Sequence, residues 1–257
     1  MRLDTYLSDN GLAKSRSYAK TLIEEGYVTV NGDIQKKPSF DVTADDSIIV
    51  TGKPYDYVSR GGVKLECALS EFSIDVSGFV CVDIGASSGG FTDCLLKCGA
   101  KKVYAVDSGS GQLDSSLRSD ERVVNIENFN ARNLTADDLG EKCDIAVTDV
   151  SFISQTLIIP AAVSVLKDDG IFVSLIKPQF ECGREGLGKG GIVKSKKIMA
   201  EAVKKVIDCA KLNGLFCKGL VTSSIKGGDG NTEFLMVCTK KEYSTVNDSM
   251  IKEIVGL

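Results

Sequence analysis

The sequence predicts a doubly wound α/β domain with a mostly parallel sheet, preceded by a small α+β domain. After about residue 60, short apolar runs alternate with periodic stretches typical of helices, which is the pattern of a parallel sheet covered by helices. A glycine-rich segment, residues 83–91, follows the first of these runs, where a strand would turn into a helix. Upstream of the alternation, Gly52, Pro54 and Asp56 interrupt the apolar periodicity. The chain of 257 residues is 43% hydrophobic, which is enough to bury one large core and one small one.

Residues 1–52 are expected to form the small domain. A short helix begins near Leu3, and a second helix follows Ser15, a natural N-cap residue, and ends at Gly26. Residues 27–30 then alternate as a strand, and the Asn-Gly dipeptide after them is favoured in a tight type I′ hairpin turn. Two helices and a small sheet in so short a segment give a domain of marginal size.

Residues 53–59 are expected to be a linker, and residues 60–257 are expected to form the large domain. The apolar runs predict buried parallel strands over residues 79–84, 102–106, 123–126, 144–147 and 171–176. The periodic stretches predict helices over residues 61–72, 89–98, 154–167 and 195–213. A Gly-Gly-Asp-Gly turn separates two last strands, which we expect to pair as an antiparallel hairpin at one edge of the sheet, over residues 215–224 and 232–239.

The composition excludes several kinds of chemistry. The sequence contains no histidine, so it cannot form a Ser-His-Asp nucleophile, a histidine general base or a histidine-liganded metal site. The nine cysteines are odd in number and include no Cys-x-x-Cys pair, so we expect neither a disulfide framework nor a bound metal. No secretory signal segment and no apolar run of about 18 residues is present, which predicts a cytoplasmic protein that does not associate with membranes.

Positive charge is concentrated in one part of an otherwise acidic chain. The net charge is -4, yet residues 177–226 hold eleven lysines and arginines against four carboxylates. Binding to nucleic acid needs only a local basic patch, so this run is a candidate RNA-binding surface. A solvated, lysine-rich helix face explains the run equally well.

The glycine-rich segment predicts a nucleotide-binding loop. Gly85, Gly89 and Gly90 let the backbone pass close to a ligand while the N–H groups of a helix face it. A hydride-transfer fingerprint would place a glycine where Ser87 stands, and Asp107 ends the next strand, where a carboxylate can bind ribose hydroxyls. These features favour S-adenosylmethionine over a nicotinamide cofactor, although a purely structural turn stays possible. The candidate cofactor-binding residues are Asp83, Gly85, Ala86, Ser87, Gly89, Gly90, Phe91, Asp107 and Asp149.

Four charged residues, remote in sequence, are expected at the same crevice. Asp149 and Lys177 each follow a predicted parallel strand, and ligands of open α/β sheets bind at the carboxyl ends of their strands. Lys64 lies in the predicted helix before the sheet, and Glu233 lies in the terminal hairpin. A single lysine at a strand end is usually just solvated, so their joint placement carries the prediction.

The N-terminal segment resembles the ribosomal protein S-four-like RNA-binding domain. The resemblance rests on Arg-Leu-Asp at residues 2–4, on Ser-Arg-Ser-Tyr-Ala-Lys at residues 15–20 and on Val-Thr-Val-Asn-Gly at residues 28–32. It implies that RNA phosphate binds on the second helix, where Arg16 and Lys20 share one face. The expected RNA-binding residues are Arg2, Arg16, Lys20 and Arg60.

The large domain resembles the FtsJ-like ribose 2′-O-methyltransferases. Their Lys-Asp-Lys-Glu tetrad corresponds to Lys64, Asp149, Lys177 and Glu233. With the N-terminal domain, the whole chain resembles the TlyA-type ribosomal RNA methyltransferases of bacteria, a family often labelled haemolysins. This resemblance implies methyl transfer from S-adenosylmethionine to a ribose 2′-hydroxyl of ribosomal RNA, on cytidine. Lys177 would be the base or would orient the hydroxyl. Asp149 and Glu233 would orient the two lysines and the hydroxyl.

Two other functions stay open at this point. A membrane-active protein would suit the haemolysin label, and a non-catalytic RNA-binding or ribosome assembly factor would retain the same residues without using them. The sequence makes no prediction of the modified nucleotide position, of the ribosomal subunit or of the oligomeric state.

Overall fold

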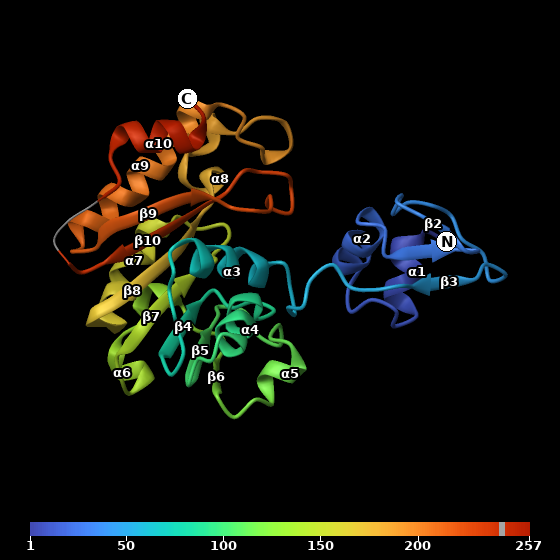
Figure 1. Ribbon diagram of the computed structural model, residues 1–257, viewed down its shortest axis with the longest axis horizontal. Helices are drawn as coiled ribbons and strands as arrows, with labels where there is room; N and C mark the ends of the chain where they lie inside the picture. Colours follow the sequence, from blue (N-terminus) through green and yellow to red (C-terminus); the bar gives the residue numbers. More distant parts are fainter. Residues whose placement is uncertain (242–244) are drawn as a thin grey trace. The chain divides into compact units, whose positions relative to one another are not determined.

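The computed structural model describes residues 1–241 and 245–257 and divides into two compact units, Met1–Ser59 and Arg60–Leu257 (Figure 1). Each unit has a hydrophobic core of its own. The buried cluster of the first lies within residues 3–42, and the largest cluster of the second lies within residues 80–255. The two units are described separately.

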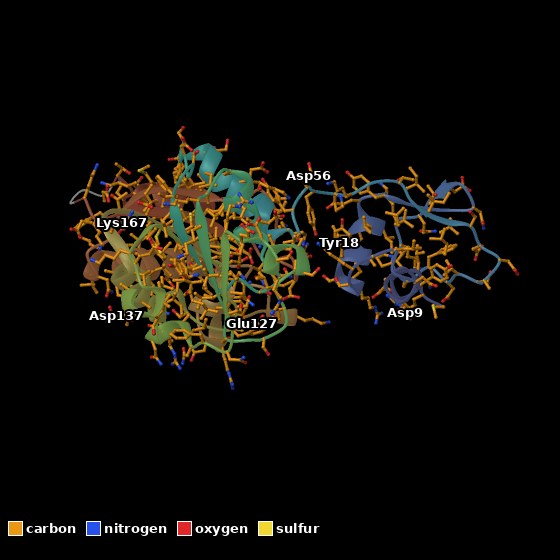
Figure 2. The ribbon with its side chains drawn as sticks, turned by 90° about the horizontal axis from the view of Figure 1, so that it is seen from below. Asp9, Tyr18, Asp56, Glu127, Asp137 and Lys167 are labelled. Atoms are coloured by element: carbon orange, nitrogen blue, oxygen red, sulfur yellow. The ribbon has the colours of Figure 1, made fainter. Side chains whose placement is uncertain are left out.

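The first unit packs two helices against a three-stranded antiparallel sheet. Its elements are α1 (Leu3–Asp9), α2 (Arg16–Glu24), β1 (Val28–Val30), β2 (Asp33–Ile34) and β3 (Ile48–Val50), and the strand order is β2-β1-β3. Ser15 caps α2 as expected, because its hydroxyl accepts a hydrogen bond from the Tyr18 N–H at 3.2 Å. Asn31 and Gly32 both have positive φ, as a type I′ turn requires. Tyr18, labelled in Figure 2, also packs edge-on against Tyr55.

The second unit contains a seven-stranded sheet in the order β6-β5-β4-β7-β8-β10-β9. The first five strands in sequence are parallel, and β10 pairs antiparallel with both β8 and β9. This topology confirms the predicted doubly wound sheet and its terminal antiparallel hairpin. The strands are β4 (Val80–Ile84), β5 (Lys102–Val106), β6 (Val123–Ile126), β7 (Cys143–Thr148), β8 (Leu166–Ile176), β9 (Phe216–Thr222) and β10 (Phe234–Thr239).

Helices cover both faces of this sheet (Figure 1). Side chains alternate between the faces of a strand, and Val82 and Ile84 share one buried cluster with α7, α9 and α10. Asp83 points to the other face, where it accepts a hydrogen bond from Thr92 in α4. The helices are α3 (Gly61–Glu71), α4 (Gly90–Lys97), α5 (Ser115–Arg118), α6 (Ala136–Leu139), α7 (Ile159–Val165), α8 (Pro178–Glu181), α9 (Lys196–Leu212) and α10 (Asp248–Val255), with short 3-10 turns at Ala131–Asn133, Gln155–Leu157, Arg184–Gly186 and Lys189–Gly191.

The segment of residues 154–167 differs from its prediction as a single helix. Ser154 caps a 3-10 turn, α7 begins only at Ile159, and β8 already begins at Leu166. Pro160 explains the late start, because proline has no N–H and is tolerated in the first turn of a helix. The last helix, α10, was not predicted. It buries Ile251 and Val255, four residues apart on one face.

None of the helices formed by residues 1–241 and 245–257 could cross a lipid bilayer, since none is both long and apolar enough. The longest, α9, has 17 residues, and only one face of it is buried. That face is made of six side chains at helical spacing: Met199, Ala202, Val203, Val206, Ile207 and Ala210.

Candidate active site

A cavity of about 470 Å³ opens at the carboxyl ends of the parallel strands. This is the edge of an open α/β sheet at which ligands bind, and the volume lies within the usual range of small-molecule sites. Its wall comes from the segments that follow β4, β5, β6 and β7. The lining residues are Gly85, Ser87, Asp107, Ser108, Gln112, Asn130, Ala131, Asp149, Val150, Ser151, Phe152, Ile153 and Ile158.

The loop after β4 passes very close to the loop after β7. Gly85 has a φ of +88°, and a Cβ there would lie 2.8 Å from the Val150 side chain and 3.2 Å from the Asp149 carbonyl oxygen. Only glycine fits such a position. Ser87 also has positive φ, a strained conformation for a residue with a side chain, and its N–H donates to Asp107 at 2.8 Å. The backbone therefore presents Ser87 and Asp107 together at the cavity.

Asp107 is fixed by two backbone donors. Besides Ser87, the Gly109 N–H donates to its other carboxylate oxygen at 2.7 Å. Glu127, labelled in Figure 2, holds the segment that follows Asp107. It accepts a hydrogen bond from the Gly111 N–H and pairs with Arg118 at 2.6 Å. A carboxylate has further lone pairs beyond these bonds, so Asp107 can still accept hydrogen bonds from a ligand in the cavity.

Asp83 lies at the end of β4, beneath this loop, and is fully buried. One oxygen accepts from both the N–H and the hydroxyl of Thr92, at 2.9 and 2.7 Å. Its other oxygen, Oδ1, makes no hydrogen bond to the described residues. Burial raises the pKa of Asp83 to about 7, and the neighbouring charges of Asp149 and Asp107 add to the shift, while the Thr92 bonds oppose it. Negative charge on Asp83 is therefore disfavoured beside Asp107 and Asp149, and the folded protein favours its protonated form.

Lys177 and Asp149 form the first of two ion pairs in the site. Lys177 Nζ lies 2.6 Å from Asp149 Oδ1, a charge contact without the alignment of a hydrogen bond, and it donates to the Ser151 hydroxyl at 2.9 Å. Asp149 directly follows β7 and Lys177 directly follows β8, which are neighbouring parallel strands. The adjacent ends of these strands account for the contact.

Lys64 and Glu233 form the second pair. Lys64 Nζ, from α3, lies 2.6 Å from Glu233 Oε2, and both side chains are nearly sealed from solvent. Glu233 ends the loop between β9 and β10, and a Cβ on Gly227 in that loop would lie 2.4 Å from Glu233 Oε1. The loop therefore leaves room for the Glu233 carboxylate only because residue 227 has no side chain.

The sheet register aligns the two pairs. Phe234 of β10 pairs with Ile176 of β8, so Glu233 and Lys177 continue the register as the next residues facing each other. The structure thus brings Lys64, Asp149, Lys177 and Glu233 to the carboxyl ends of β7 and β8 and the adjoining start of β10. Of the four residues, Asp149 lines the cavity.

The expected cofactor residues occupy different places in the structure. Gly85, Ser87, Asp107 and Asp149 line the cavity, whereas the others lie behind its wall: Asp83, Ala86, Gly89, Gly90 and Phe91. Gly89 has a packing role, because a Cβ there would lie 2.3 Å from Leu117. Asn130, Ser108 and Gln112 line the cavity without having been predicted. Asn130 lies shortly after the end of β6, a position that the rule for ligand sites in parallel sheets could have singled out.

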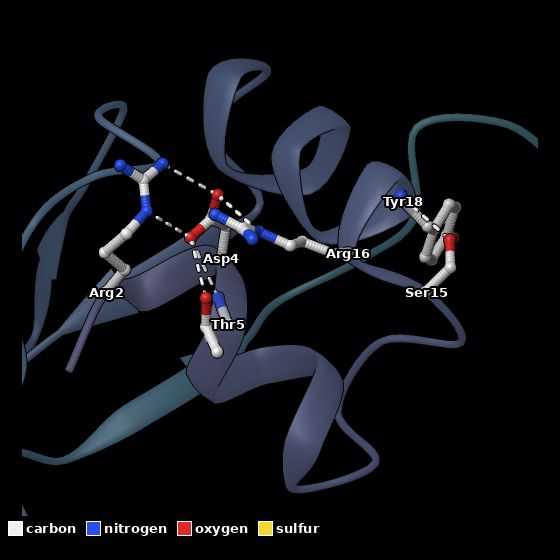
Figure 3. A network of polar contacts seen from close by, with 6 residues as sticks. All are labelled: Arg2, Asp4, Thr5, Ser15, Arg16 and Tyr18. Carbon is white, nitrogen blue, oxygen red and sulfur yellow. Dashed lines mark hydrogen bonds and ion pairs between the residues drawn. The ribbon is translucent and has the colours of Figure 1, made fainter.

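Two of the expected RNA-binding residues share one buried carboxylate in the first unit (Figure 3). Arg2 donates to both oxygens of Asp4 at 3.0 and 2.9 Å, and Arg16 pairs with Asp4 at 3.2 Å. The hydrogen bond from Arg2 is the main reason why the pKa of Asp4 lies well below its ordinary value. Both arginines stay exposed, and Lys20 is exposed on the same helix as Arg16. Arg60, in the second unit, is half-buried at the start of α3.

The basic run of residues 177–226 is partly neutralised. Lys204 lies 2.6 Å from Asp248 and 3.7 Å from Asp208, and Lys205 lies 3.5 Å from Glu181. Lys196 donates to the Gly256 carbonyl at 2.5 Å. Because carboxylates lie beside these lysines, α9 has less unpaired positive charge than its number of lysines suggests.

The chain matches two families along its length. Residues 1–48 match the S4 domain and residues 57–241 match the FtsJ-like methyltransferases. YqxC of Bacillus subtilis, named as a candidate rRNA methyltransferase, is 47% identical, covering 91% of this chain and 84% of its own. Hemolysin A of Brachyspira hyodysenteriae is 45% identical, covering 91% and 98%. TlyA of Mycobacterium tuberculosis, a 16S/23S rRNA (cytidine-2′-O)-methyltransferase, is 42% identical, covering 91% and 88%.

Solved structures agree with these relatives. A hemolysin-labelled protein of Streptococcus thermophilus is 41% identical, with a TM-score of 0.81 over 100% of this chain and 94% of that one. A similarly labelled protein of Lactococcus lactis is 46% identical, with a TM-score of 0.74 over 78% of this chain and 97% of that one. The chain therefore belongs to the FtsJ-like methyltransferase family, as a TlyA-type member with an S4 domain ahead of the methyltransferase domain.

Proposed function

We propose that this protein transfers the methyl group of S-adenosylmethionine to the ribose 2′-hydroxyl of a cytidine in ribosomal RNA. The observation that carries the proposal is the placement of the Asp149–Lys177 and Lys64–Glu233 pairs at neighbouring ends of the sheet, with Asp149 lining the cavity. The substrate is supported by the activity named for the TlyA relative at 42% identity and by the S4 domain.

The cavity suits S-adenosylmethionine on two grounds. Asp107, fixed at the end of β5, can accept hydrogen bonds from ribose hydroxyls, and Gly85 lets the backbone approach the ligand closely. The ligand is a cation, and the carboxylates of Asp107 and Asp149 line the cavity proposed for it. When bound, the cofactor supplies a methyl group on a sulfonium leaving group.

The protein's own task is to align the 2′-oxygen and to remove its proton. We assign Lys177 to the hydroxyl. An ammonium cannot accept a proton, so Lys177 acts as the base only in its neutral form and otherwise orients the hydroxyl, while Asp149, 2.6 Å away, orients Lys177. Ser151 holds Lys177 in place from the other side. Lys64 and Glu233 complete the charge balance around the reacting atoms.

RNA contacts are proposed on both units. In the first unit, Asp4 holds Arg2 and Arg16 in fixed positions while their remaining N–H groups face solvent, which suits them to phosphate. In the second unit, Phe152 lines the cavity with its ring almost fully exposed and its centroid 5.1 Å from that of Phe180. An exposed ring beside the reacting groups suits stacking of an unpaired base.

Methyl transfer to isolated ribosomal subunits tests the proposal. Purified protein is given S-adenosylmethionine labelled in the methyl group with small subunits, large subunits or protein-free ribosomal RNA. We expect label in 2′-O-methylcytidine after digestion, and a loss of rate of at least about 100-fold in Lys177→Ala. Lys252→Ala is the matched control, because Lys252 is an exposed lysine of α10 outside the basic run of residues 177–226.

Each other outcome contradicts a specific part of the proposal. Wild-type protein that binds both cofactor and RNA but transfers no methyl group is an RNA-binding factor, not a catalyst. Full activity of Lys177→Ala refutes the role of Lys177. Label on a base instead of a ribose refutes the reaction.

A further inference from the structure

We propose that Glu181 is a positioning residue, which anchors the wall of the cofactor cavity and thereby keeps Asp149 against Lys177. The role of Glu181 in catalysis rests on the proposed function. Glu181 ends α8, four residues after Lys177, and its side chain is only 1% exposed. A buried carboxylate is costly unless it is fully hydrogen-bonded, so its partners show what the residue does.

Both carboxylate oxygens bind the segment that follows β7. Oε1 accepts from the Gln155 N–H at 2.7 Å, and Oε2 accepts from the Ser154 hydroxyl at 2.5 Å. Hydrogen bonds to an ionised acceptor are stronger than neutral ones. Lys205 of α9 secures Glu181 from behind, since its Nζ lies 3.5 Å from Oε2 and donates to the Glu181 carbonyl at 2.9 Å.

Gln155 extends the anchor into the sheet. Its side chain is buried, its Nε2 donates to the Leu175 carbonyl at 3.1 Å, and its Oε1 accepts from the Thr148 hydroxyl at 3.0 Å. Thr148 directly precedes Asp149, and Leu175 lies two residues before Lys177. One buried network therefore joins Glu181 to the strand ends that carry the ion pair.

The segment of residues 149–155 is consequently tied to the turn after β8 at two points. At its start, Lys177 contacts Asp149 and Ser151, and at its end Glu181 holds Ser154 and Gln155. The residues between these points, 150–153, line the cavity. Removing Glu181 deletes the hydrogen bonds that hold the far end of the cavity wall, so we expect the wall and the ion pair to loosen together.

The charge of Glu181 is balanced within the same network. Burial raises the pKa of its carboxyl, while the hydrogen bonds from Ser154 and Gln155 and the charge of Lys205 act against the increase. Its oxygens are thus kept as acceptors for two donors, Ser154 and the Gln155 N–H, that are part-buried or buried themselves. Truncation to alanine would leave both donors without their partner.

Single-turnover methyl transfer and calorimetric titration with S-adenosylmethionine test this anchor in the full-length protein. We expect Glu181→Ala to slow transfer about 100-fold, as loss of alignment does, and to weaken cofactor binding about tenfold, while the KM for RNA changes less than twofold. Glu181→Gln retains an oxygen for the Gln155 N–H and should lose only about fivefold in rate. The control is Glu201→Ala, an exposed glutamate of α9 that pairs only loosely with Lys197 at 4.0 Å.

A double-mutant cycle separates positioning from general destabilisation. If Glu181 acts through the ion pair, Glu181→Ala in the Lys177→Ala background costs no further rate, whereas an effect on stability alone would multiply the two losses. A multiplicative result, or a folded Glu181→Ala protein with wild-type rate and cofactor affinity, overturns the proposal. If Glu181→Ala does not fold, Ser154→Ala carries the same test. It removes the bond to Glu181 Oε2 together with the cap on the Thr156 N–H, and the expected loss is about fivefold.

Failure of the proposed function gives a different result. If the wild-type protein transfers no methyl group, the cofactor titration still reports on the cavity wall. Weaker binding by Glu181→Ala then supports the anchor, and unchanged binding refutes it.

Discussion

At the scale of single residues, several carboxylates are buried, and most of them pair with a lysine or an arginine. Asp4 is held by two arginines, Glu181 by Lys205 and two hydrogen-bond donors, and Glu233 by Lys64. Asp83 is different, because its neighbours Thr92, Asp107 and Asp149 supply hydrogen bonds and further negative charge. A protein tolerates such a group in its core only at a cost in stability, which points to its use at the cavity.

Asp83 makes the free energy of unfolding depend on pH in a defined direction. Its pKa is about 7 in the folded protein and about 3.9 in an unfolded chain, so folding favours the protonated form. The stabilising contribution is fully present below about pH 4 and is lost as the pH rises through 7, at most about 4 kcal/mol in total. Urea denaturation of the wild type and of Asp83→Asn between pH 4.5 and 8 measures it.

We expect the difference in free energy of unfolding, wild type minus Asp83→Asn, to fall steadily over that range. The asparagine keeps an acceptor for the Thr92 N–H and hydroxyl but does not titrate, which makes it the appropriate reference. Parallel pH curves for the two proteins would contradict the raised pKa of Asp83.

The positions of Asp149 and Lys177 in the sheet could be predicted from the sequence, whereas the residues that hold them in place could not. Lys177 and Asp149 each follow an apolar run that predicts a parallel strand. The topology of a parallel sheet then places both residues at the carboxyl ends of the strands. Glu181 carries no such signal, because its burial depends on Ser154 and Gln155, which reach it only in the folded protein. The burial of Asp4 between Arg2 and Arg16 was not predicted for the same reason.

At the scale of secondary-structure elements, uniform apolar runs were predicted well and capped or interrupted segments were not. β5 and β6 have the bounds that the sequence predicts. Val103 to Val106 of β5 are buried as expected, whereas β6 lies at the edge of the sheet and none of its four residues is fully buried. The segment of residues 154–167 has one helical pattern in sequence but contains a 3-10 turn, a helix and the start of a strand. The Ser154 cap and Pro160 divide it, and their effect depends on local backbone geometry.

The loop between β9 and β10 offers a test of how an element positions Glu233. In Gly227→Ala the new methyl group would lie 2.4 Å from Glu233 Oε1, so either the loop or the carboxylate must shift away from Lys64. We expect the rate of methyl transfer to fall at least about tenfold, because misplaced groups lose alignment. The free energy of unfolding should fall by about 1–3 kcal/mol, as overpacking of a filled site does.

Gly228→Ala is the matched control in the same loop. A Cβ there would lie 3.4 Å from the Arg60 guanidinium, which is an ordinary contact. Single-turnover rates and urea denaturation of both variants give the comparison, and equal rates for the two alanine variants would show that Gly227 does not position Glu233.

At the scale of the whole molecule, the two units divide the proposed work. Every residue of the tetrad and of the cavity lies within Arg60–Leu257, and the S4 domain match lies within residues 1–48. Each unit also has a buried cluster composed of its own residues. The proposed cofactor site and the S4 domain thus lie in separate folding units.

The fragment of residues 60–257 should bind S-adenosylmethionine but methylate ribosomal RNA poorly. Its cavity and ion pairs are complete, so we expect a cofactor dissociation constant within about twofold of the full-length value, measured by calorimetry. It lacks Arg2, Arg16 and Lys20, so methylation should fall at least about 100-fold at physiological salt and affinity should depend less on salt concentration, since fewer phosphates are neutralised. The full-length Arg2→Ala/Arg16→Ala variant should share the shallower salt dependence because Asp4 holds these two groups together. Undiminished methylation by the fragment would place RNA recognition in the methyltransferase domain itself.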